Sequence, residues 1–268
     1  MNAKQKFPGP SGTIFSEIDH IGTTGSTNAD LLDYMRAGGS QGAVLVADHQ
    51  SAGRGRQARN WLDEPGNSVL MSVSLNPSAP VAPLSPLIGG IAVVDALNQL
   101  DAEFGYLGVD RFGLKWPNDV LVPSMGEKKL AGILSEAITV PDASGEPCWA
   151  VVLGIGLNLR WSQTLAGGVG AGGVALEDVF AQSIDRWVLV EHLLVAIDRV
   201  LGQAERQGPA PLVAQYRDRC LTLGRQVRFV TSTGEVEGIA SGIGDDGALL
   251  VQTPNAIVSL VAGDAHHV

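Results

Sequence analysis

The sequence predicts an α+β fold, in which a large domain of mixed strands and helices precedes a small β-barrel. Its 268 residues are 45% hydrophobic and 17% charged, which is enough for one large core and a smaller one. Up to about residue 221, stretches with the two-residue period of strands alternate with stretches that have the period of helices. From Gly224 onward only short alternating segments remain, which is typical of a barrel.

The first part of the large domain is predicted to contain three strands and one short helix. The strands cover residues 14–21, 43–47 and 68–75, and the last of them has apolar residues at every second position, as in a half-buried strand. The helix covers residues 29–36, because Ser26-Thr27-Asn28 precede it as possible N-caps and Gly38 follows it.

The second part of the large domain is predicted to begin and end with helices. Ser85-Pro86 begins a helix, since proline suits the first helical position. Gly208-Pro209 stops a long amphipathic helix. The expected helices cover residues 85–100, 183–207 and 210–221, and the expected strands cover residues 112–116, 129–136 and 149–153.

The predicted division of the chain has three parts. A polar stretch rich in Gly and Pro, residues 1–12, is expected to be a flexible tail. The large domain then occupies residues 13–221, and the barrel residues 222–268. The barrel strands are expected at residues 227–230, 236–243, 248–251 and 257–261.

Composition excludes several classes of function. The net charge of -10 disfavours broad binding to nucleic acids or membranes, since both are anionic. Cys148 and Cys220 make no disulfide framework, and no spacing of Cys and His indicates a metal cage. No apolar run approaches the ~20 residues of a membrane span, and the N-terminus lacks the apolar core of a signal peptide. A cytoplasmic protein is expected.

One basic segment, residues 53–61, stands out in this acidic chain, and we call it the arginine loop. It contains Arg54, Arg56 and Arg59 together with Gly53 and Gly55. Glycine allows a close approach of the backbone to a ligand, and the guanidinium fork matches carboxylate and phosphate oxygens. The residues alone leave open whether the loop binds a small anion or forms surface ion pairs in solvent.

Four other polar segments allow both a structural and a functional interpretation. Ser26-Thr27-Asn28 could cap a helix or hold a polar ligand group. Asn118-Asp119 is ordinarily a turn, but with Lys115 it could direct a charge pair into a cleft. Lys129 lies at the mouth of an apolar strand, where it either meets an anion or reaches out to solvent. The fourth segment has Gly154, Gly156 and Asn158 at a strand end, and indicates either a nearby flat ligand or a turn.

Taken together and in this order, these segments resemble those of the biotin protein ligases. The resemblance extends from about Ile18 to the C-terminus and is carried by five separated motifs followed by a small barrel. The motifs are Ser26-Thr27-Asn28; Gln50 with Gly53-Arg54-Gly55-Arg56; Lys115-Trp116-Pro117-Asn118-Asp119; Lys129-Leu130-Ala131-Gly132-Ile133; and Gly154-Ile155-Gly156-Leu157-Asn158.

The resemblance implies a fold and a reaction. The fold would be a mixed sheet with flanking helices, related to class II aminoacyl-tRNA synthetases, plus an SH3-like barrel. The reaction would have two steps, in which biotin and ATP first give biotinyl-5′-AMP and pyrophosphate. A lysine of a biotin carboxyl carrier domain would then accept the biotinyl group and release AMP. ATP would bring Mg²⁺, and the enzyme would be a monomer or a homodimer.

The resemblance also implies roles for individual residues. Catalysis would fall to Lys129, Arg56 and Asp119, with Asp119 near either Mg²⁺ or the incoming lysine. Biotin would be held by Ser26, Thr27, Asn28, Gln50, Gly53, Arg54, Arg56, Lys129 and Gly132. The nucleotide would be held by Arg56, Trp61, Lys115, Asn118, Gly154, Gly156 and Asn158.

The chain departs from the family pattern at some points, and two other functions stay open. Ala58 stands where members often have glycine, and the gap between Asp119 and Lys129 is a few residues longer than usual. Because about twenty residues precede the first motif, the resemblance is to monofunctional members, and no DNA binding is expected. The alternatives are a lipoate or octanoate ligase or transferase of the same superfamily and a non-catalytic biotin-responsive binding protein.

Overall fold

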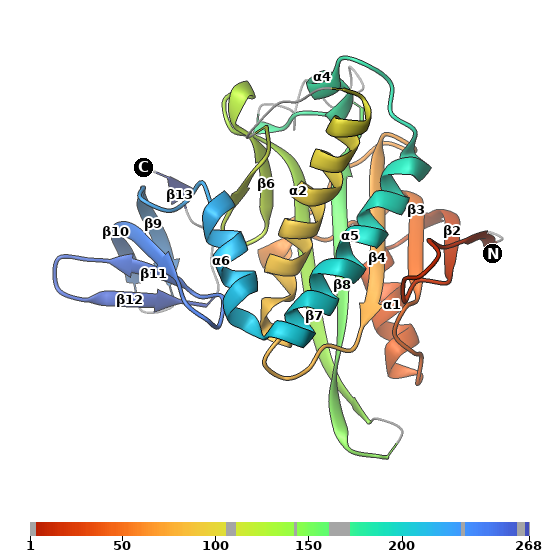
Figure 1. Ribbon diagram of the computed structural model, residues 1–268, viewed down its shortest axis with the longest axis horizontal. Coiled ribbons are helices and arrows are strands. Elements are labelled where there is room, and N and C mark those ends of the chain that lie inside the picture. The colour runs from red at the N-terminus through yellow and green to blue at the C-terminus, as the bar shows by residue number, and fades with distance from the viewer. Residues whose placement is uncertain are drawn as a thin grey trace.

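The computed structural model describes residues 4–105, 111–141, 144–160, 172–231, 234–261 and 266–267, which form two sheets and their flanking helices (Figure 1). The larger sheet contains β1 to β8, and the smaller one contains β9 to β13. The N-terminus lies at the side of the molecule opposite the small sheet (Figure 1). The mixed sheet with flanking helices and the small C-terminal β unit confirm the predicted fold class.

The large sheet is mixed, because β2 and β3 run parallel while its other neighbouring strands are antiparallel. Its strands lie in the order β1-β2-β3-β4-β8-β7-β6-β5. Their bounds are β1 Gln5–Pro8, β2 Glu17–Thr24, β3 Val44–Gln50, β4 Ser68–Leu75, β5 Gly113–Lys115, β6 Asp119–Val122, β7 Lys128–Pro141 and β8 Pro147–Asn158. The hairpin of β7 and β8 extends beyond the rest of the sheet (Figure 1).

Helices cover the two faces of this sheet unequally. The main core lies on the face covered by α2 (Ser85–Glu103) and α5 (Arg186–Gln207), beside α6 (Pro209–Arg219) (Figure 1). A smaller apolar cluster lies on the other face, under α1 (Thr27–Arg36). The short helices are η1 Arg56–Ala58, η2 Ala82–Leu84, η3 Pro123–Met125 and α4 Leu176–Phe180. None of the described helices is long and apolar enough to cross a membrane.

Helix α2 packs closely on the sheet at Gly89. A Cβ atom on Gly89 would lie 2.9 Å from Cγ2 of Ile133 and 3.1 Å from Cδ1 of Leu153. Any larger residue would therefore push the helix away from β7 and β8. Strand β4 differs from its expected half-buried state, because all its residues are buried, including Ser72 and Ser74. The reason is its central position, with protein on both faces of the sheet.

The N-terminal segment is not a flexible tail along its whole length. Residues 5–8 form β1, which pairs with β2 and covers the edge of the sheet. Lys4 forms an ion pair with Asp19 at 3.0 Å, and the ring centroid of Phe7 lies 4.6 Å from that of Trp187. Composition alone missed this strand because its main contacts are backbone bonds to β2 and one aromatic ring.

The small sheet is antiparallel, as expected of the predicted barrel, with the order β12-β11-β10-β9-β13. Its strands are β9 Gln226–Thr231, β10 Gly234–Ile243, β11 Leu249–Gln252, β12 Ile257–Leu260 and β13 His266–His267. It is attached to the large sheet through Trp116, whose Nε1 donates to the Gly247 carbonyl at 2.9 Å. The backbone N–H of Trp116 donates to Oγ1 of Thr222 at 3.0 Å, and its ring meets Phe229 edge-on.

The attachment through Trp116 predicts a stability effect. Trp116→Phe would leave the buried Gly247 carbonyl without its partner, and the free energy of unfolding should fall by about 1–3 kcal/mol. Urea denaturation followed by circular dichroism measures the change. Trp149→Phe is the matched control, since Trp149 is 42% exposed. Equal stabilities of the two variants would show that the Trp116 contact does not hold the small sheet.

Candidate active site

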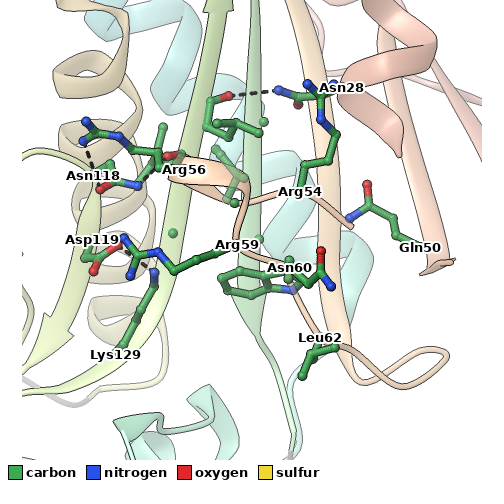
Figure 2. A pocket seen from close by; sticks show the side chains of 18 of the residues that line it. Asn28, Gln50, Arg54, Arg56, Arg59, Asn60, Leu62, Asn118, Asp119 and Lys129 are labelled. Atoms are coloured by element: carbon green, nitrogen blue, oxygen red, sulfur yellow. Dashed lines mark hydrogen bonds and ion pairs between the residues drawn. The ribbon is translucent and has the colours of Figure 1, made fainter. Parts of the chain in front are cut away.

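A cavity of about 350 Å³ opens on the α1 face of the large sheet, between the arginine loop and strands β7 and β8. Figure 2 shows Arg56, Asn118, Asp119 and Lys129 gathered on one side of it and Asn28 with Arg54 on the other. The loop and both sides of the cavity come from segments far apart in the sequence, which only the fold brings together.

Most of the residues that the sequence singled out line this cavity. They are Ser26, Thr27, Asn28, Gln50, Arg54, Arg56, Trp61, Asn118, Asp119, Lys129, Gly132, Gly154, Gly156 and Asn158. Two others do not line it. Lys115 lies on β5 opposite Asp119 in the strand pairing, and the Gly53 carbonyl accepts the backbone N–H of Trp61 at 3.0 Å. Gly53 thus shapes the loop, because a Cβ atom there would lie 2.6 Å from the Trp61 carbonyl oxygen.

Several further residues line the cavity without having been given an individual role from the sequence. Gly55, Arg59 and Asn60 belong to the arginine loop, and Ile133 and Ile155 lie within the quoted motifs. The remaining ones lie outside every motif and carried no signal of their own. They are Leu62, Met71, Leu134, Gly172 and Gly173.

The floor of the cavity consists of glycines on paired strands. Gly132 of β7 lies opposite Gly156 of β8, and Gly154 comes two residues before Gly156 on β8. A Cβ atom on Gly154 would lie 2.0 Å from Oδ1 of Asn28, and one on Gly156 would lie 2.7 Å from Cε2 of Trp61. The glycines therefore admit the Asn28 amide and the Trp61 ring against the sheet.

Lys129 is the cation that β7 places at the edge of this floor. Its Nζ lies 2.7 Å from Oδ1 of Asp119 and 5.6 Å from the centre of the Trp61 ring. The Lys129 side chain is 36% exposed, so it remains accessible from the cavity. The predicted charge pair at the strand end thus exists, but Asp119 forms it with Lys129 and not with Lys115, and residues 116–118 make the turn between β5 and β6.

Two arginines of the loop point to opposite sides of the cavity (Figure 2). Nη2 of Arg54 donates to Oε1 of Glu136 at 2.8 Å. Nη1 of Arg56 makes a longer contact of 3.5 Å with Oδ1 of Asn118. Burial lowers the pKa of Arg56, and the nearby Asp119 partly offsets this effect. A partly buried guanidinium is destabilised by lost hydration, so an anion entering the cavity would gain a strong partner.

The start of α1 provides the neutral polar side of the cavity. Ser26 occupies the N-cap position but makes no side-chain capping bond. Oε1 of Gln50 instead accepts the backbone N–H of Thr27 at 2.7 Å. The simple capping interpretation of Ser26 is therefore wrong, and the three residues stand at the cavity with Gln50.

Asn158 at the end of β8 has mainly backbone partners. Its Nδ2 donates to the carbonyls of Lys129 at 3.3 Å and Val174 at 3.2 Å. It thereby fixes the main chain at the start of β7, where Lys129 stands. Within the described part of the chain, no group of three His, Cys, Asp or Glu side chains could hold a metal ion.

Comparison with known proteins supplies the family. A model described as "Biotin/lipoate A/B protein ligase family" matches residues 23–158, which include every cavity-lining motif named above. A Mycobacterium tuberculosis protein, biotin–[acetyl-CoA-carboxylase] ligase, is 36% identical over 262 residues, covering 96% of this chain and 91% of its own. The chain belongs to the biotin/lipoate protein ligase family.

Further matches within the family concern biotin. A second model, "Biotin protein ligase C terminal domain", matches residues 222–268. A Paracoccus denitrificans biotin–[acetyl-CoA-carboxylase] ligase is 33% identical, covering 87% of this chain and 93% of its own. The Aquifex aeolicus biotin protein ligase solved with biotin and ATP has a TM-score of 0.72 at 25% identity, covering 92% of this chain and 96% of that one.

The glycine floor predicts a second stability effect. Gly154→Ala should lower the free energy of unfolding by about 1–3 kcal/mol, because the new methyl group must displace Asn28. Gly22→Ala in β2 is the control, since the nearest atom to its Cβ is Oδ2 of Asp48 at 4.0 Å. Thermal unfolding compares the two, and an unchanged melting temperature for Gly154→Ala would contradict the close contact with Asn28.

Proposed function

We propose that this chain is an ATP-dependent biotin protein ligase. It activates biotin to biotinyl-5′-AMP and then transfers the biotinyl group to a lysine of a biotin carboxyl carrier domain. The observation that carries the proposal is one cavity with a neutral polar side at Thr27 and Gln50 and cations at Arg54, Arg56 and Lys129. The named relatives from Mycobacterium tuberculosis and Paracoccus denitrificans support acetyl-CoA carboxylase as the source of the carrier.

Biotin has a neutral ureido ring at one end and a carboxylate at the other, and the cavity has the same polarity. Ser26, Thr27 and Gln50 would contact the ureido group. The valeryl chain would run over Gly132 toward Lys129, where its carboxylate meets a cation. Asn28 lines the side of the cavity opposite Lys129, and its amide donates to the Leu134 carbonyl at 3.1 Å (Figure 2).

Adenylation joins two anions, so the site must supply positive charge where it accumulates. Lys129 would neutralise the biotin carboxylate and then the α-phosphate oxygens, leaving its contact with Asp119 as substrates enter. Arg56 would hold the phosphate from the loop side, because its guanidinium is already partly dehydrated. Closing of the arginine loop would keep water from the reactive mixed anhydride.

The nucleotide would occupy the part of the cavity near Trp61 and Asn118. The Trp61 ring offers a flat apolar surface, and Gly154, Gly156 and Asn158 border the same region. Mg²⁺ would arrive with the triphosphate. Among the described residues that line the cavity, Asp119 has the carboxylate that could contact Mg²⁺. A single carboxylate is consistent with a metal ion that is held mainly by the phosphates of ATP.

Transfer requires the amine of the carrier lysine to attack the carbonyl carbon of biotinyl-AMP. The new amide bond forms as the acyl–phosphate bond breaks, AMP leaves with the electron pair, and the amine loses a proton. Asp119 would either accept that proton or hold Lys129 in place for the leaving phosphate. The proposed reaction uses ATP and a carboxylase carrier, and we accordingly assign it to the cytoplasm.

Transfer of biotin to an apo carrier domain tests this function, with lipoate as the competing acid. Biotinylation that needs ATP and is not diminished by lipoate is expected. Transfer of lipoate in preference to biotin would identify the enzyme as a lipoate ligase of the same family. Binding of biotin without AMP formation would indicate a non-catalytic binding protein.

Lys129→Ala should fold normally yet lose about 10²–10³-fold in biotin-dependent pyrophosphate release, because the cation at the reacting oxygens is gone. The exposed neighbour Lys128 provides the control variant Lys128→Ala, which has the same change in charge one residue away. Retention of near-normal pyrophosphate release by Lys129→Ala would show that the role assigned to Lys129 is wrong.

Arg56→Gly should let biotinyl-AMP escape from the enzyme. The escape is measured as biotin attached to lysines of bovine serum albumin present in excess, and an increase of about tenfold is expected for the loss of one charge-assisted contact. Arg36→Gly, at the exposed end of α1, serves as the control. If the intermediate stays bound in Arg56→Gly, the loop does not retain it through this residue.

A further inference from the structure

A chain of polar side chains runs behind the cavity and connects its neutral side to the arginine loop. It begins at Thr27, passes through Ser72 and Asn28, and ends at Glu136, whose other oxygen holds Arg54. Ser72 is fully buried, and neither Ser72 nor Glu136 lines the cavity. No motif contains these two residues, and none of the roles above involves them.

The carboxylate of Glu136 fixes the orientation of the Asn28 amide. Nδ2 of Asn28 donates to Oε2 of Glu136 at 3.0 Å and to the Leu134 carbonyl at 3.1 Å, and both groups can only accept. Oδ1 of Asn28 must therefore face Ser72, which lies 2.6 Å away. A carbonyl oxygen only accepts, so the single proton of Ser72 goes to Asn28.

The position of the Ser72 proton determines the role of Thr27. The oxygens of Ser72 and Thr27 are 2.7 Å apart and need a proton between them, which must then come from Thr27. Gln50 lies further from the Thr27 hydroxyl, at 3.1 Å, and already accepts the Thr27 backbone N–H at 2.7 Å. Thr27 is thus left with lone pairs that accept from a ligand N–H, while Gln50 keeps its Nε2 hydrogens for a ligand carbonyl.

The second oxygen of Glu136 connects this chain to the loop. Oε1 accepts from Nη2 of Arg54 at 2.8 Å, which makes Glu136 a shared anchor for α1 and the arginine loop. The Glu136 side chain is 24% exposed and that of Arg54 47%, so the pair lies at the cavity edge, where loop opening would break it. Closing the loop and orienting Thr27 therefore depend on one carboxylate.

We propose that Ser72 and Glu136 are positioning residues, which hold Thr27 as a hydrogen-bond acceptor toward the ureido N–H of biotin. Glu136 also latches the closed loop through Arg54. The inference rests on the proposed function, since it takes biotin as the ligand whose N–H meets Thr27. The inference adds that Ser72 and Glu136, which do not line the cavity, set its specificity for the ureido group of biotin.

Ser72→Ala tests the hydrogen-bonded series of Thr27, Ser72, Asn28 and Glu136 directly. Without Ser72, the Thr27 hydroxyl can turn its proton to Gln50 or into the cavity, so its lone pairs are no longer held in the direction of the ligand N–H. Biotin binding in calorimetry without ATP should weaken about tenfold, as should KM for biotin, for the loss of one oriented hydrogen bond. KM for ATP and kcat at saturating biotin should stay within about twofold.

Ser72→Cys provides a second variant that keeps the branching of the side chain but replaces the hydroxyl with a larger thiol, which is a weak donor and weak acceptor. It should weaken biotin binding in the same direction. Unchanged biotin affinity in either folded variant would overturn the inference, as would an equal change in KM for ATP, because a general structural defect would not separate the two substrates.

Glu136→Gln separates the latch from the chain. It should weaken biotin binding and increase the escape of biotinyl-AMP by more than Ser72→Ala does, because both variants lose the oriented Thr27 contact to the ureido group but only Glu136→Gln also weakens the contact with Arg54. Glu191→Gln, on the exposed surface of α5, is the control for the lost charge. The double variant Ser72→Ala with Glu136→Gln should weaken biotin binding by less than the product of the single effects, since both act on Thr27.

Pyrophosphate release by the wild-type enzyme separates a failure of the positioning role of Ser72 and Glu136 from a failure of the proposed function. If wild type releases pyrophosphate with biotin and all variants match it, the positioning chain is wrong and the proposed function stands. If wild type releases none with biotin, the proposed function itself fails, and the inference fails with it.

Discussion

The site depends on the close approach of side chains to bare backbone on two paired strands. Gly132, Gly154 and Gly156 lie on β7 and β8 with no Cβ atoms between the sheet and the residues above it. The space this leaves is filled by the Asn28 amide and the Trp61 ring, and it sets the depth of the cavity. Because β7 also carries Lys129 and Glu136, the same strand pairing fixes the floor, one cation and the shared anchor of the loop.

The charges of the site follow from this geometry. The protein has a net charge of -10, yet lysine and arginine side chains line the cavity. Two of these cations form ion pairs with carboxylates from the sheet. Lys129 lies against Asp119, and Arg54 lies against Glu136. Such pairs stabilise the empty site only modestly, since all four side chains are partly exposed. An anionic ligand can therefore replace Asp119 beside Lys129, or Glu136 beside Arg54, at a small cost in free energy. Arg56 is more buried and has lost more hydration, so it gains the most interaction energy from an anionic ligand.

The sequence predicted the contacts that local motifs carry and missed those that strand register creates. Thr27, Gln50, Arg56 and Lys129 were found because short motifs place them, but their mutual arrangement required the fold. Ser72 is a polar residue in a strand with alternating apolar residues, and Glu136 is the polar last residue of the strand expected at residues 129–136. Neither position indicated a function in the sequence. Their contacts become visible only when the pairing of β4 with β8 and of β8 with β7 brings them beside Asn28. Lys115, which the resemblance assigns to nucleotide binding, pairs with Asp119 in the strand register and does not line the cavity, so its role stays a prediction.

The central claim is that the cavity binds biotin and ATP together and joins them without covalent attachment to the protein. Native mass spectrometry of the full chain after incubation with biotin, ATP and Mg²⁺, in the absence of any carrier, tests it most directly. The account predicts a non-covalent one-to-one complex whose added mass is that of biotinyl-5′-AMP and which disappears on denaturation. A covalent biotinyl adduct on the protein, or a complex containing unreacted biotin alone, would contradict it.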